Sequence, residues 1–377
     1  MKIVIAPDAF KDSLSAEAVA SAMENGVKKF SENAICYKLF ASDGGEGFLD
    51  SVATYIPNLK KNMTNTVDPL GRSHVAYYLF DSEKLTAYIE LAKASGIELL
   101  KPKERNPLVT STYGTGLQIK DALEKGAEKI YLGIGGSATN DAGTGIAQAL
   151  GYEFLDEEEN QLNANGENLV KIKTIRMPEV VFNEVEFFAV NDVLNPLFGP
   201  QGAAHTYAKQ KGASPSEIEF LDKGLQHIDQ QIQKHLGLSN ANIPGAGAAG
   251  GTAFGCKCFL NANFISGTSF ILGISGFKEL LTSEKISCIV TGEGKIDFQT
   301  AYGKFVYGMI QEANQYKVPV LAVCGKLDLD TNGVKELGLL AAKQLYDPSK
   351  PVSYSFENAE QLVMEKTLEL LQENFIQ

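Results

Sequence analysis

The sequence of 377 residues contains no tryptophan and four histidines, and its five cysteines are an odd number. Cys256 and Cys258 form a CxC pair without a second pair, and the histidines show no metal-ligand spacing, so a zinc site is not indicated. The other cysteines lie in or beside apolar runs, where cysteine behaves as a small hydrophobic residue. No GxSxG, HExxH or Cys/His pairing marks a catalytic nucleophile. These absences predict a reduced, cytoplasmic protein.

Positive charge is also scarce: 34 lysines and arginines stand against 46 aspartates and glutamates, which gives a formal net charge of −12. Nucleic acids and anionic membranes bind basic surfaces, so neither partner is predicted. No apolar run approaches the ~18 residues of a membrane span, and the first residues enter a strand-like run without a signal peptide. A small anionic substrate is compatible with this negative net charge, because a local cationic pocket can lie in an acidic protein. The oligomeric state is left open.

The order of strand-like and helix-like segments changes along the chain. Both ends alternate strand and helix, which is typical of a parallel sheet. Between them, the strand-like runs Met63–Val67 and Val75–Phe80 flank a hairpin-style connection at 68–72. The predicted fold class is therefore α/β with two dissimilar domains. A Rossmann-like domain is built from residues 1–60 and 271–377, and a mixed α/β domain with antiparallel strands is inserted over residues 61–270.

A glycine-rich stretch at 129–151 is predicted to form a strand, a tight loop and a helix over 142–150. Gly135 and Gly136 would let backbone N–H groups approach an anion at the helix N-terminus, with the Ser137 hydroxyl beside them. Asn140 or Asp141 would cap the helix. The stretch is neither a P-loop nor a dinucleotide fingerprint, and a tight turn without a ligand is the alternative. A second glycine-rich stretch, 244–255, indicates either another anion-facing loop or close backbone packing.

Several apolar runs end at a loop that carries a carboxylate. Since ligands of open α/β sheets bind outside the carboxyl ends of strands, these loops predict a cleft for Mg²⁺ and phosphate. The alternative for each acid by itself is a helix cap. The carboxylates are Asp8, Asp43 with Glu46, Asp141, Asp192, and Glu293 with Asp297.

A cleft that handles phosphate also needs positive charge. Lys11, Lys295 and Lys304 are spaced so that they could reach it, and Arg72 and Arg105 could clamp a substrate carboxylate. Solvated surface charge is the alternative reading of these residues.

Long segments of this chain resemble the bacterial glycerate kinases of the type-1 family. The matching segments are APDAFKDSLSA (6–16), SDGGEGFLDSV (42–52), DPLGR (68–72), IELAKASG (89–96), NPLVTSTYGTG (106–116), GIGGSATNDAGTG (133–145), the ND, LNPLFGP, GAA, YA and QKGA parts of 191–213, PGAGAAGG (244–251) and TGEGKIDFQTAYGK (291–304). The family commonly has Ser and Gly where this chain has Ala9 and Asp12. The resemblance implies ATP-dependent phosphorylation of D-glycerate to 2-phosphoglycerate with Mg²⁺, by two dissimilar α/β domains.

The motif-dense loops then give a hypothesis for the substrate. Glycerate would lie between the domains, with its carboxylate held by Arg72 or Lys11 and by backbone N–H groups near Gly44 and Gly45. Asp192 is the first choice to accept the hydroxyl proton and Asp43 the second. The remaining predicted substrate residues are Asp8, Ser42, Glu46 and Asn191.

The same loops give a hypothesis for the phosphoryl donor. Gly135, Gly136 and Ser137, with Asn140 and Asp141, would bind the nucleotide phosphates. Glu293 and Asp297 would hold Mg²⁺, and Lys295 would neutralise the phosphoryl group in flight. Two rival functions are a kinase for another small hydroxy acid and a non-catalytic metabolite-binding protein.

Overall fold

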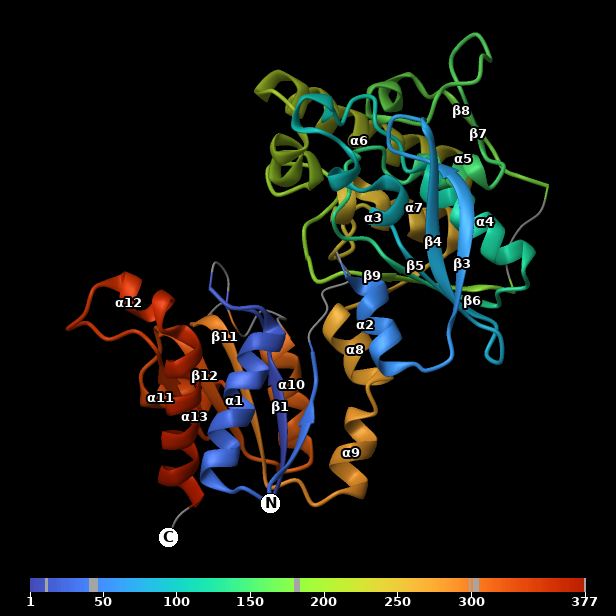
Figure 1. Ribbon diagram of the computed structural model, residues 1–377. Helices are drawn as coiled ribbons and strands as arrows, with labels where there is room; N and C mark the ends of the chain where they lie inside the picture. The colour runs from blue at the N-terminus through green and yellow to red at the C-terminus, as the bar shows by residue number, and fades with distance from the viewer. Residues whose placement is uncertain (11–12, 41–46, 180–183, 298–299, 301–304, 376–377) are drawn as a thin grey trace. The chain divides into compact units, whose positions relative to one another are not determined.

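The computed structural model describes residues 1–10, 13–40, 47–179, 184–297, 300 and 305–375. The fold is mixed α/β, with two main sheets that belong to two compact units (Figure 1). The first unit joins both chain ends, Met1–Ser42 and Gly267–Gln377, and the second is Asp43–Ser266. Within the described residues, no helix combines the length and the apolar character that a membrane span requires.

The first unit contains a parallel sheet of five strands in the order β13-β12-β11-β1-β2. Numbered within this unit, the order is 2-1-3-4-5, which is the flavodoxin-like order among doubly wound sheets. The strands are β1 (Lys2–Pro7), β2 (Ile35–Lys38), β11 (Cys288–Ile296), β12 (Val320–Leu327) and β13 (Ala341–Gln344). The helices are α1 (Ala16–Phe30), α8 (Gly267–Ile274), α9 (Phe277–Ser283), α10 (Phe305–Gln315), α11 (Thr331–Glu336), α12 (Val352–Glu357) and α13 (Ala359–Phe375).

Helices α1 and α13 pack side by side and share one apolar core with the sheet (Figure 1). Val19, Met23 and Val27 form the apolar face of α1 and are fully buried in this core. Ser15 caps this helix by accepting a hydrogen bond from the Ala18 N–H at 3.3 Å. Because strand side chains alternate, residues such as Val4 face away from this core.

The second unit contains a mixed sheet of six strands in the order β10-β9-β6-β5-β4-β3. Strands β10, β9, β6 and β5 run parallel, and β4 and β3 continue the sheet antiparallel, so the predicted hairpin at 68–72 is confirmed. The strands are β3 (Lys60–Val67), β4 (Ser73–Asp81), β5 (Thr86–Glu90), β6 (Lys129–Gly133), β9 (Glu186–Val190) and β10 (Asn263–Ile265), with a separate pair of β7 (Glu153–Leu155) and β8 (Thr174–Arg176).

The helices of the second unit form one large apolar core with this sheet. They are α2 (Phe48–Tyr55), α3 (Ala92–Ser95), α4 (Tyr113–Glu124), α5 (Thr144–Ala149), α6 (Pro215–Leu236) and α7 (Ala248–Leu260). Helices α4 and α5 approach closely at Gly116, where an added Cβ would lie 2.6 Å from the Cβ of Ala149. The glycines of these helices therefore serve close packing.

Two sequence interpretations need correction. Helix α2, predicted with the first domain, groups with the second unit because it contacts β4 and β5, and the Leu49 N–H donates to the buried Glu90 carboxylate at 3.1 Å. The segment after Val290, predicted as a loop, continues β11 to Ile296 because it pairs with β12 along that length.

Candidate functional site

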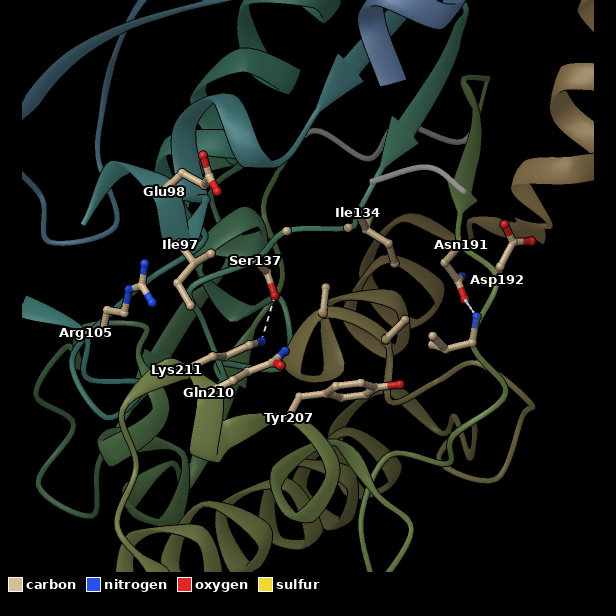
Figure 2. A pocket seen from close by; sticks show the side chains of 15 residues that line it. Ile97, Glu98, Arg105, Ile134, Ser137, Asn191, Asp192, Tyr207, Gln210 and Lys211 are labelled. Atoms are coloured by element: carbon tan, nitrogen blue, oxygen red, sulfur yellow. Dashed lines mark hydrogen bonds between the residues drawn. The ribbon is translucent and has the colours of Figure 1, made fainter. Parts of the chain in front are cut away.

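A pocket of about 650 Å³ lies at the carboxyl ends of β6 and β9 in the second unit (Figure 2). The two strands are paired in register up to Gly133 and Val190, so the loops that follow them begin at one edge of the sheet. Five residues predicted from separate motifs line this pocket together: Gly135, Gly136, Ser137, Asn191 and Asp192. The pocket is also lined by Glu98, Arg105, Tyr207, Gln210 and Lys211.

The loop after β6 is held by backbone hydrogen bonds to the segment after α3. The Ile97 N–H donates to the Gly136 carbonyl at 2.9 Å, and the Ala138 N–H donates to the Ser95 carbonyl at 2.9 Å. Gly136 has φ of +70°, a left-handed conformation that favours glycine. The loop therefore has a defined shape, which places the Ser137 side chain at the pocket.

Lys211 supplies a buried positive charge at this pocket. It lies in a short 3-10 helix, Lys209–Lys211, and is only 3% exposed. Its amine donates to the Ser137 hydroxyl and to the Thr139 carbonyl, both at 2.7 Å (Figure 2). Burial lowers the pKa of Lys211 to about 7, although the charge of Asp141 acts in the opposite direction.

Lys211 was missed as a site residue in the sequence, where its one signal was its place in the QKGA segment. A lysine ammonium has three N–H donors, and two of those of Lys211 go to neutral oxygens. The remaining donor suits an anionic group bound in the pocket.

Asp141 is fully buried and does not line the pocket. Its carboxylate accepts hydrogen bonds from the Thr112 N–H and hydroxyl at 2.8 Å, from the Gly143 N–H at 3.2 Å and from the Gly145 N–H at 3.3 Å. Burial raises its pKa, and these hydrogen bonds oppose the shift. Asp141 thus occupies the N–H groups of Gly143 and Gly145 at the start of α5, whereas those of Gly135 and Gly136 are not among its donors.

Asn140 also lies outside the pocket lining and is fully buried. Its amide oxygen and nitrogen, like the Thr139 hydroxyl, have no hydrogen-bond partner among the described residues. The sequence grouped Asn140 and Asp141 with Gly135–Ser137, whereas the structure separates a buried pair from the pocket wall.

Asn191 and Asp192 follow β9 directly, on the side of the pocket away from Arg105 (Figure 2). The Asn191 N–H donates to the Ile265 carbonyl at 3.1 Å, and its side-chain oxygen accepts from the Val193 N–H at 3.3 Å. These bonds fix the turn from which Asp192 extends. Asp192 thus lines the same pocket as Lys211, with its carboxylate directed away from the Lys211 amine in the view of Figure 2.

The glycine-rich stretch 244–255 serves mainly close packing. A Cβ at Gly250 would lie 2.0 Å from the Thr139 carbonyl oxygen, and one at Gly255 would lie 2.2 Å from that of Ala142. Its residues Ala248 and Ala249 line the pocket. The stretch thus holds α7 against the loop that carries Thr139 and Asn140.

The two arginines considered for a carboxylate clamp have different surroundings. Arg105 lines the pocket, and its buried Nε has no hydrogen-bond partner within the described part of the chain. Arg72 is about half exposed in the β3–β4 hairpin, does not line the pocket, and pairs with Asp68 and Glu104. The hydrogen bonds from Arg72 to these carboxylates raise its pKa. Arg105 is therefore the better placed of the two.

A second set of predicted residues lies at the carboxyl edge of the first unit's sheet. Glu293 is 5% exposed on β11 and accepts a hydrogen bond from the Thr300 hydroxyl at 2.8 Å. The same hydroxyl accepts from the backbone N–H of Asp297 at 3.2 Å, so Thr300 links the Glu293 carboxylate to the main chain at Asp297. Asp8 follows β1, and its N–H donates to the Gly292 carbonyl at 2.8 Å.

Lys295 also belongs to this edge, where it forms ion pairs with Asp297 at 2.8 Å and Asp328 at 2.9 Å. These carboxylates raise its pKa. No cluster of three metal-ligating side chains occurs among the described residues. Glu293 and Asp297 nevertheless fit Mg²⁺, which commonly takes one or two carboxylates and completes its shell with water and phosphate oxygens.

Other predicted residues fall outside the described ranges. They are Lys11, Ser42, Asp43, Gly44, Gly45, Glu46 and Lys304.

Comparison with known proteins gives a consistent assignment. Residues 3–373 match the model of the glycerate kinase family. The chain is 42% identical to a glycerate kinase of Halalkalibacterium halodurans, with 91% of this chain and 90% of that protein covered. It is 38% identical to a glycerate 2-kinase of Escherichia coli, with 90% and 89% covered. A crystal structure of a protein from Salmonella typhimurium, provisionally named glycerate kinase 2, superposes with a TM-score of 0.79 at 34% identity, and covers 98% of this chain and 97% of that one. The chain belongs to the glycerate kinase family.

Proposed function

We propose that this protein transfers a phosphoryl group from ATP to the 2-hydroxyl of D-glycerate, with Mg²⁺. Membership of the glycerate kinase family supports the reaction, and the name of the Escherichia coli relative supports the 2-position. The observation that carries the proposal is one pocket that combines a buried cation, Lys211, with a carboxylate, Asp192. A small hydroxy acid needs both groups, one for its carboxylate and one for its hydroxyl proton.

In this proposal the pocket of the second unit binds glycerate. The glycerate carboxylate takes the remaining N–H donor of Lys211, and Arg105 adds a second cation in the lining. The sequence assigned Gly135–Ser137 to nucleotide phosphate, which offers the same anionic oxygens as a carboxylate. Replacement of Lys211 separates the two ligands: loss of glycerate binding raises KM for glycerate, and loss of phosphate binding raises KM for ATP.

Asp192 is proposed to accept the proton of the attacking hydroxyl. A carboxylate in this position raises the nucleophilicity of the hydroxyl as the bond to phosphorus forms, and the proton moves to the Asp192 carboxylate. Asp43, the second choice, lies outside the described residues. The turn around Asn191 would keep the Asp192 side chain in place during the reaction.

Glu293 and Asp297 are proposed to hold Mg²⁺, with Thr300 orienting the Glu293 carboxylate and Lys295 contacting the Asp297 carboxylate. Bound Mg²⁺ would neutralise phosphate charge and orient the phosphoryl donor. Lys295 would add positive charge near the same carboxylates. Transfer between two domains stays a prediction from the sequence.

The experiment is incubation of the protein with ATP, Mg²⁺ and D-glycerate, followed by phosphorus NMR of the product and a coupled assay for ADP. We expect 2-phosphoglycerate and glycerate-dependent ADP release. Tartronate and hydroxypyruvate, assayed in parallel, test the rival in which another small acid is the acceptor. Binding of glycerate without any ADP release would contradict the proposal in favour of a metabolite-binding protein.

A further inference from the structure

The first unit contains a separate pocket of about 420 Å³ at the carboxyl ends of β11, β12 and β13. Its lining includes Phe10, Gly294, Gly325, Leu345, Tyr346 and Phe356. Ligands of open α/β sheets bind outside the carboxyl ends of the strands, and pockets of this volume with aromatic and apolar walls commonly take small organic molecules. The proposed glycerate site, which lies in the second unit, uses none of these residues.

The floor of this pocket is bare backbone. Strands β11 and β12 pair Glu293 with Cys324 and Lys295 with Lys326, so Gly294 and Gly325 lie between these pairs on neighbouring strands. Both glycines line the pocket, and a Cβ at Gly325 would lie 2.5 Å from the Gly294 carbonyl oxygen. The absence of two neighbouring side chains leaves a flat surface, which suits a planar ring.

The walls of the pocket are apolar and partly open. Phe10 and Leu345 are each 3% exposed, whereas Val352 and Phe356 of α12 are 59% and 50% exposed. Val352 and Phe356 are four residues apart and therefore share one face of the helix. Helix α12 has no buried residue, although it carries these two large hydrophobic side chains. A ligand ring in the pocket would cover apolar surface that water otherwise contacts.

We propose that this pocket binds the purine base of the nucleotide that donates the phosphoryl group. The proposal rests on the function proposed above, which requires such a donor. Gly294 of the lining and Glu293, a carboxylate assigned to the Mg²⁺ that accompanies nucleotide phosphates, both lie near the carboxyl end of β11, with their side-chain directions on opposite faces of the strand. Polar groups at the pocket, including the Ser355 hydroxyl, which donates to the Leu345 carbonyl at 3.3 Å, offer hydrogen-bonding partners to a base edge.

The test uses two variants of α12, Phe356→Ala and Val352→Asp, in the full-length protein. Both side chains are largely exposed, so the fold should persist. Phe220→Ala on α6, which removes an exposed phenylalanine away from the pocket, is the matched control. Calorimetric titrations with ADP, adenosine and inorganic tripolyphosphate measure base and phosphate binding separately.

Loss of the Phe356 ring should weaken ADP and adenosine binding about tenfold or more, which is typical of one base–aromatic contact. Tripolyphosphate binding and the KM for glycerate should not change, and Phe220→Ala should bind as the wild type does. Unchanged ADP and adenosine affinities in both α12 variants would overturn the proposal. If the wild type binds adenosine in this way but does not phosphorylate glycerate, the base pocket stands and the proposed function fails.

Discussion

Lys211 and Lys295 carry the same charge in opposite surroundings. Lys211 is 3% exposed, and the oxygens it contacts, on Ser137 and Thr139, are neutral. The Lys295 side chain is 50% exposed and contacts the carboxylates of Asp297 and Asp328. Burial lowers the pKa of Lys211 to about 7, whereas carboxylate contacts raise the pKa of Lys295.

This difference indicates which of the two lysines a bound anion would stabilise more. The charge of Lys295 is already compensated by protein carboxylates, so an added anion gains less there. The ammonium of Lys211 donates to neutral oxygens and is shielded from water, with the charge of Asp141 acting on it, so a bound carboxylate would further stabilise its charged form. The pocket of the second unit is thus the better candidate for capture of an acid, and the edge of the first unit for a metal with phosphate.

The largest expected effect comes from the carboxylate in the Lys211 pocket. Asp192→Asn should lower kcat by roughly 10²- to 10⁴-fold, because the amide cannot accept the hydroxyl proton, while the fold persists. Steady-state kinetics measure kcat, and circular dichroism checks that the fold persists. Glu98→Gln, which alters another carboxylate in the same lining, is the control and should change kcat little. Wild-type turnover in Asp192→Asn would remove this residue from the role.

The next largest effect is expected when the buried cation Lys211 is replaced. Lys211→Met should raise KM for glycerate roughly 10- to 150-fold, the range for loss of one hydrogen bond to a charged group. KM for ATP should change little. Lys209→Met removes an exposed lysine two residues away and is the matched control. A rise in KM for ATP alone would instead assign the pocket to nucleotide phosphate.

The carboxylate edge of the first unit should respond to metal rather than to glycerate. Asp297→Asn should raise the Mg²⁺ concentration for half-maximal activity by at least about tenfold, since a ligand is lost. Asp328→Asn removes the other carboxylate partner of Lys295 and is the control. The coupled assay, run at increasing Mg²⁺ concentrations, distinguishes Asp297→Asn from Asp328→Asn. Equal Mg²⁺ requirements in the wild type and Asp297→Asn would contradict the assignment.

The smallest effect is a dependence on pH. Above its pKa of about 7 the Lys211 amine loses its charge, so KM for glycerate should rise by up to about tenfold per pH unit. KM of Lys211→Met should lack this rise. A rise of equal slope in the variant would show that another group titrates.

The same group should affect stability in a defined direction. In the unfolded chain Lys211 keeps its proton up to the ordinary lysine pKa of 10.5, and in the folded protein it loses the proton above about 7. Between these values the unfolded state binds more protons, so the contribution of Lys211 to stability rises with pH. Urea unfolding of the wild type and Lys211→Met across this range should therefore show a stability difference that changes with pH.

Much of the fold was predictable from local patterns. The alternation of strand and helix at both chain ends predicted the parallel sheet of the first unit, and the hairpin residues 68–72 predicted the antiparallel pair β3 and β4. The extension of β11 to Ile296 was not predictable from local patterns. Its TGEGK sequence has the composition of a loop and becomes a strand through pairing with β12. Pairing across the sheet is a tertiary effect that local composition does not carry.

The candidate site likewise contains residues that were predicted from the sequence and residues that were missed. Gly135, Ser137 and Asp192 were predicted from their places after strands, and the parallel pairing of β6 and β9 brings them to one pocket. Lys211 was missed because a lysine between polar residues is usually a solvated charge, and its burial depends on contacts with Ser137 and Thr139, over 70 residues away. Asp141 was predicted to bind nucleotide phosphate or to cap the helix, and the structure buries it, with hydrogen bonds from Thr112, Gly143 and Gly145.

Calorimetric titration of D-glycerate, without nucleotide, into the wild type, Lys211→Met and Lys295→Met tests whether the pocket of the second unit binds glycerate. We predict that Lys211→Met loses most of the glycerate affinity and that Lys295→Met keeps it. Equal affinity in the wild type and Lys211→Met, or a loss confined to Lys295→Met, would contradict the assignment of glycerate to the pocket of the second unit.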